Sequence, residues 1–199
     1  MKTKVDLHVH SRYSNKPSYW ALRKFRCPES FTSPQFIYET CKKIGMDYVT
    51  ITDHNCIRGA LEIAHHPDTF ISSELTAYFP EDGCKVHVVA LDIDKETFAD
   101  LNQARKNIYE LSHYLNENRI AHFLAHPLYI QNDRLSVEHI EKLLLLFNHF
   151  EVINGNRARR FNQFTTDLLY SLNATQIADL VDKHRIDPIG ETPWAKVSV

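Results

Sequence analysis

Short runs of apolar and β-branched residues recur along the chain, separated by segments with helical spacing. Such runs predict strands, because β-branched and aromatic side chains suit a half-buried pleated surface. The predicted strands lie at residues 4–9, 48–52, 70–73, 85–91, 120–125 and 150–153, and residues 185–189 are a further candidate.

Helical segments follow most of these strands. Ser33 and Pro34 predict a helix start, since a hydroxyl caps the first turn and proline suits its first position, and Gly45 predicts that helix's end. Apolar residues at helical spacing predict one long helix over residues 97–118. The remaining predicted helices span residues 58–64, 136–147, 160–172 and 175–184.

This alternation of strands and helices implies an α/β fold with a parallel sheet or a barrel. A length of 199 residues suits one domain. We therefore expect a single domain over residues 1–199, with a polar and aromatic insertion at about residues 15–32. Tyr19, Trp20 and Phe25 in this insertion either cover a site as a lid or pack against the domain.

Composition narrows the class of protein. The hydrophobic content of 43% supports a real core, and a net charge of −2 gives no reason to expect nucleic acid or a membrane surface as a partner. No apolar stretch approaches the roughly 20 residues of a transmembrane helix. The first residues enter a strand at once, so we expect no signal peptide. The four cysteines lack metal-type spacing, so a cytoplasmic location is expected.

Side chains that commonly bind metals stand at or just beyond the ends of the predicted strands. Alternate residues of a strand point to the same side, so the rings of His8 and His10 share one face. Two neighbouring imidazoles suit a metal site better than a core, and barrels carry their sites at the carboxyl ends of the strands. The other residues at such positions are His54, Glu74, His126 and Asn154, with His87 nearer the middle of its strand.

Each of these residues also has a purely structural interpretation. A single histidine is most often a core or surface residue, and His87 could be exposed on its strand. Glu74 is harder to explain in this way, because a carboxylate buried without a cation carries a large desolvation cost. Asp6 and Asp53 flank the histidines, where they either support catalysis by fixing a ligand's tautomer or make ordinary turn hydrogen bonds.

The motifs DLHVHSRYS and ITDHN resemble the first two motifs of the PHP (polymerase and histidinol phosphatase) family of metal-dependent phosphoesterases. Glu74, His87 and the AHP triplet at 125–127 are similar to its later ligand positions, in the same order. The resemblance implies a distorted (β/α)7 barrel with two or three divalent metals, either Zn, Mn or Fe. It also implies that His8 and His10 bind one metal, Glu74 bridges to a second held by His87 and His126, and His54 binds a third.

Two features depart from that family pattern. Asn15 stands where many members have an aspartate ligand, and no Gly-Ser-Asp-x-His motif follows before Val199. We expect either a barrel that is incomplete at its C-terminus or final ligands that are supplied differently.

The resemblance implies hydrolysis of a small phosphorylated substrate by attack of metal-bound hydroxide. Arg23 and Arg157 are candidates for binding the phosphate, because guanidinium matches that anion bidentately, and Asn154 is a third candidate for substrate binding. Two alternatives remain open: a non-catalytic metal-binding or regulatory module, and an amide or cyclic-ester hydrolase on the same centre. The pattern leaves the oligomeric state open.

Overall fold

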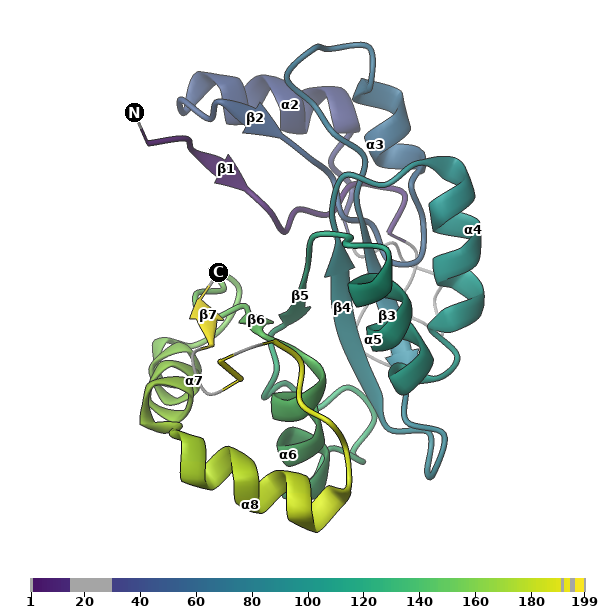
Figure 1. Cartoon of the computed structure of the whole chain (residues 1–199). Helices are drawn as coiled ribbons and strands as arrows, with labels where there is room; N and C mark the ends of the chain where they lie inside the picture. Colours follow the sequence, from purple (N-terminus) through teal and green to yellow (C-terminus); the bar gives the residue numbers. More distant parts are fainter. Residues whose placement is uncertain (1, 15–29, 191, 194–195, 199) are drawn as a thin grey trace.

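The structure is a computed structural model that describes residues 2–14, 30–190, 192–193 and 196–198 (Figure 1). It confirms a mixed α/β fold. The strands are β1 (Val5–Asp6), β2 (Tyr48–Val49), β3 (Ser73–Tyr78), β4 (Lys85–Ala90), β5 (His122–Ala125), β6 (His149–Phe150) and β7 (Val197–Ser198). The helices are α2 (Pro34–Lys43), α3 (Arg58–Ile63), α4 (Lys95–Ala104), α5 (Ile108–Glu117), α6 (Val137–Leu146), α7 (Arg159–Ser171) and α8 (Ala174–His184).

The described strands form two sheets instead of a closed barrel. β1 and β2 pair in parallel, and a second sheet has the order β3-β4-β5-β6-β7. Two isolated parallel bridges, between Val49 and Thr69 and between His54 and Glu74, connect the smaller sheet to the larger one. No pairing between β1 and β7 closes a ring within the described part of the chain, so the (β/α)7 barrel stays unconfirmed.

The centre of the larger sheet is antiparallel, which corrects the expectation of an all-parallel arrangement. β3 pairs with β4 and β4 pairs with β5 in antiparallel register. A tight connection makes this possible: Phe79 donates its backbone N–H to Cys84, and Gly83 at φ 72° donates to Phe79. Glycine adopts this left-handed conformation at little cost, so the chain turns back directly and no crossover helix is needed.

Two further predictions about elements are wrong. The single helix expected over residues 97–118 is divided into α4 and α5, because the Asn107 side chain accepts a hydrogen bond from the Tyr109 N–H and starts a new helix. No strand forms at 185–189, and β7 lies further along the chain. The strand expected at 70–73 begins at Ser73 and runs on to Tyr78, which places Glu74 near its start.

Hydrophobic packing supports the sheet from several sides. Buried leucines of α4, α5 and α6 pack with the central strands around Leu75, Val88 and Leu124, and Figure 1 shows α4 and α5 beside β3 and β4. A smaller core joins α2, β2 and α3 through Ile37 and Val49. None of the helices in the described ranges has the length and apolar character needed to cross a bilayer.

The fully buried carboxylate of Asp53 holds the loop that follows β1, and helix α3 packs closely against this contact. Asp53 accepts hydrogen bonds from the Ser11 N–H and Oγ–H, both at 2.7 Å. Gly59 lets α3 approach this pair closely, since a Cβ at that position would lie 2.2 Å from Asp53 Oδ2 and 2.6 Å from Ser11 Oγ. The loop that carries His10 is therefore held by packing against a helix that lacks a side chain at this point.

We predict that Gly59→Ala destabilises the fold. The added methyl group displaces Asp53 or Ser11 and outweighs alanine's better helix propensity, for a net loss of about 1–3 kcal/mol. Denaturant unfolding measures this loss. Gly155→Ala is the matched control, because no atom of the described residues lies within 4 Å of the place that its Cβ would take. An equal effect of the two changes would contradict the packing argument.

Candidate metal centre

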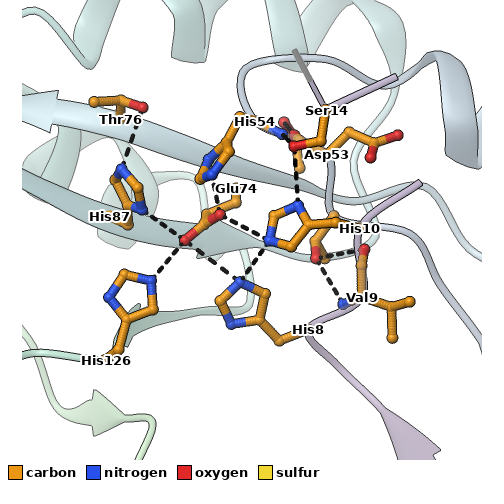
Figure 2. A network of polar contacts seen from close by, with 12 residues as sticks. His8, Val9, His10, Ser14, Asp53, His54, Glu74, Thr76, His87 and His126 are labelled. Atoms are coloured by element: carbon orange, nitrogen blue, oxygen red, sulfur yellow. Dashed lines mark hydrogen bonds and ion pairs between the residues drawn. The ribbon is translucent and has the colours of Figure 1, made fainter. Parts of the chain in front are cut away.

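The fold brings the six predicted metal ligands to one place (Figure 2). His8 and His10 follow β1, His54 follows β2 and bridges to β3, and His126 follows β5 directly. Glu74 and His87 lie within β3 and β4. Segments far apart in the sequence thus converge at one end of the sheet.

Glu74 is the centre of this cluster and is fully buried. Its Oε1 lies 2.8 Å from His87 Nδ1, 3.0 Å from His126 Nε2 and 3.4 Å from His8 Nε2. Its Oε2 lies 2.8 Å from His54 Nδ1 and 3.2 Å from His10 Nε2. A single carboxylate therefore faces five imidazole nitrogens.

Hydrogen bonding alone accounts poorly for this arrangement. Oε2 of Glu74 is buried between two imidazole nitrogens, at 2.8 Å from His54 and 3.2 Å from His10, and His8 Nε2 and His10 Nε2 themselves lie 3.2 Å apart. Protonating all five rings would place five positive charges around one negative charge in a buried site, which is electrostatically costly. Nitrogen and carboxylate donors directed at a shared space fit divalent metal ions.

The ligand atoms form two compact groups that share Glu74. One contains His8, Glu74 and His126, and the other contains His10, His54 and Glu74, with all donor atoms of a group within 4.8 Å of one another. A carboxylate common to two groups is what the family resemblance implies for Glu74. The histidine partition differs from that implication, which paired His8 with His10 and assigned His54 separately.

Burial and charge act against each other in the cluster. Burial alone would lower the pKa of His8, but the neighbouring Glu74 and Glu151 carboxylates raise it to about 10. Burial lowers the pKa of His87 to about 4, despite its contact with Glu74. Burial would raise the pKa of Glu74, yet the charges of the surrounding histidines hold it well below its ordinary value.

Glu151 is a functional candidate that the sequence analysis missed. It follows β6, is only 6% exposed, and its Oε1 lies 2.9 Å from His8 Nδ1. Its Oε2 accepts the backbone N–H of His126 at 2.7 Å, and Asn154 Nδ2 donates to Oε1 at 2.9 Å. One acidic residue in an otherwise apolar predicted strand was the only signal in the sequence.

The two aspartates have different contacts from those expected. Asp6 accepts the backbone N–H of His8, and Asp53 accepts hydrogen bonds from Ser11, so neither is hydrogen-bonded to a histidine ring among the described residues. The carboxylate that contacts a ligand imidazole is Glu151. The physical reason is position: Asp6 is an exposed residue of β1, whereas Glu151 follows β6 and is buried.

Of the three predicted substrate-binding residues, two lie at the cluster and one lies outside the described residues. Asn154 and Arg157 both line a cavity of about 250 Å³ that also contains the histidines and Glu74. Arg157 stacks on Tyr129, with Cζ 3.5 Å from the ring centroid. Arg23, and the insertion residues Tyr19, Trp20 and Phe25, lie outside the described residues.

Comparison with known proteins supports the fold. An amidohydrolase from Chromobacterium violaceum, solved with bound sulfate and no metal, has a TM-score of 0.58 with 15% identity, over 92% of this chain and 84% of the other. A proposed metal-dependent phosphoesterase from Bifidobacterium adolescentis has a TM-score of 0.47 with 14% identity, over 96% and 92% of the two chains. The first likeness covers most of both chains and concerns the fold alone, in agreement with the mixed α/β architecture.

Sequence comparison adds little. No family model matches the chain. An uncharacterized protein of Methanocaldococcus jannaschii is 44% identical over 59 residues, which is 30% of this chain and 33% of that protein. The match thus spans about a third of the curated relative.

We predict that the metal-free protein loses stability as the pH rises above neutrality. The interactions that raise the pKa of His8 to about 10, from an ordinary 6.5, stabilise the folded state. Their contribution is complete below pH 6.5 and is lost as the pH approaches 10. The loss is at most about 1.4 kcal/mol per pH unit. Thermal unfolding with chelator between about pH 7 and 9 measures it, and His8→Gln should flatten the profile. A stability that rises over this range in the parent protein would contradict the assignment.

We predict that Glu151→Gln weakens metal binding by about 10–100-fold, because outer carboxylates orient ligand histidines and raise their basicity. Competition with a chelating dye, using Zn²⁺ or Mn²⁺, measures the affinity. Glu141→Gln is the matched control: Glu141 contacts His184 at 2.8 Å between α6 and α8, outside the cluster. Equal affinities for the parent and Glu151→Gln would remove Glu151 from this role.

Proposed function

We propose that this chain is a metal-dependent hydrolase, and specifically a phosphoesterase that acts on a small phosphorylated substrate. The observation that carries the proposal is the buried Glu74 carboxylate with five imidazole nitrogens within 3.4 Å of its oxygens. His8, His10, His54, Glu74, His87 and His126 would hold two or three divalent ions. Such ions lower the pKa of water toward neutrality and neutralise charge on a phosphoryl oxygen.

The surrounding residues prepare the site for an anionic substrate. Glu151 holds His8 and the backbone of His126 in place. Arg157 adds a guanidinium to the cavity, and Asn154 adds an amide whose orientation is fixed by Glu151. Preorganised groups of this kind stabilise developing charge without reorganising during the reaction.

Amide hydrolysis on the same centre is a second candidate. The solved structure with a TM-score of 0.58 is described as an amidohydrolase, and the same ligands suit both reactions. Arg157 in the cavity favours the phosphoester, because a guanidinium matches a phosphate and a neutral amide offers it no charge.

We predict that chelation abolishes phosphoester hydrolysis and that Mn²⁺ or Zn²⁺ restores it. His10→Ala should lower the metal content and reduce kcat/KM by about 100-fold or more, since bound metal contributes several kcal/mol of transition-state stabilisation. Elemental analysis and steady-state kinetics with phosphomonoesters, and with a parallel set of amides, measure both effects. His113→Ala is the control, because His113 is 71% exposed and pairs with Glu117 on the surface of α5.

The outcomes separate the candidates. Metal-dependent turnover of amides without turnover of phosphoesters would replace the first proposal by the second. Full metal loading without hydrolysis of either class would identify a metal-binding module and overturn both.

A further inference from the structure

A second cavity adjoins the histidine cluster around Glu74. It has a volume of about 380 Å³, in the range of small-molecule sites, and shares His126, Glu151, Asn154, Asn156 and Arg157 with the cluster's cavity. The two spaces therefore lie side by side.

The far wall of this second cavity is apolar. Leu128, Tyr129 and Ile130 line it from the segment after β5, and Phe161 lines it from the first turn of α7. Ile130 is 54% exposed and Phe161 is 47% exposed, although both are large hydrophobic side chains. Apolar surface left open beside a polar cluster indicates a place for an apolar part of a ligand.

Arg157 stands at the junction of the two cavities. One face of its guanidinium stacks on Tyr129. Its Nε–H is buried and makes no hydrogen bond with any described residue. Buried donors are almost always paired, so this donor points to an acceptor that a ligand supplies. An anionic group between the cluster and the apolar wall provides such an acceptor.

We propose that the substrate is an aryl phosphomonoester, whose phosphate lies at the histidine cluster and Arg157 while its aromatic ring occupies the Tyr129–Phe161 cavity. This inference rests on the proposed phosphoesterase function for the identity of the anion. The ring itself is assigned from the shared wall, the apolar lining and the flat Arg157–Tyr129 stack, against which a planar group packs with little loss of conformational entropy.

Binding of non-hydrolysable phosphonates tests the proposal without requiring turnover. The metal-loaded protein should bind naphthylmethyl phosphonate about tenfold more tightly than methylphosphonate, since the ring buries apolar area that the methyl group lacks. Ala158 lines the cavity and is exposed at the N-cap of α7, so Ala158→Trp fills the space from its rim. This variant should reduce the preference to about twofold or less.

Phe164→Trp is the matched control, because it introduces the same indole on the same helix at a position that is 61% exposed and does not line the cavity. It should keep the preference of the parent. If Ala158→Trp fails to fold by circular dichroism, Phe161→Ser removes one wall instead and should also lower the preference. Equal binding of the two phosphonates by the parent, or an unchanged preference in a folded cavity variant, would overturn the inference.

Measurements of turnover distinguish a failure of the aryl specificity from a failure of the proposed phosphoesterase activity. Hydrolysis of naphthyl phosphate and glycerol phosphate with equal kcat/KM, together with equal phosphonate binding, would overturn the aryl specificity and leave the phosphoesterase standing. A cavity-dependent phosphonate preference without hydrolysis of any phosphoester would support the binding site and overturn the phosphoesterase.

Discussion

Burial of the Glu74 carboxylate is the constraint on which the site depends. A carboxylate with no exposed surface has to be balanced by positive charge or by a metal, because desolvation of an unpaired charge is costly. The five histidines that surround it come from four separate parts of the chain, so the balance exists only in the folded state. The cluster therefore forms only when these parts of the chain are folded together.

The antiparallel hairpin of β3 and β4 is what places Glu74 against His87. Thr76 pairs with His87 and Glu74 pairs with Val89, so Glu74 and His87 are diagonal neighbours on one face, close enough for a 2.8 Å contact. β5 then adds His126 one residue beyond its last paired position, Ala125. Register in this sheet therefore decides that Glu74 meets His87 and His126.

Glu151 links the histidine cluster to the neighbouring apolar cavity. Its two oxygens contact the His8 ring, the His126 backbone and Asn154, and it lines both spaces. Because buried groups are close-packed, a change in the position of Glu151 would disturb its contacts on both sides. One side chain therefore joins the histidine cluster to the wall of the neighbouring cavity.

Local patterns in the sequence determined much of the result. Periodicity and capping residues located most strands and helices, and the HxH and DH motifs pointed to His8, His10 and His54, because these signals act over a few residues. The antiparallel turn at Gly83, the break at Asn107, and the contact between Glu151 and His8 were decided by tertiary structure. A carboxylate 143 positions away from the ring it contacts leaves no periodic signal, and the two residues meet only once β1 and β6 are placed by the folded chain.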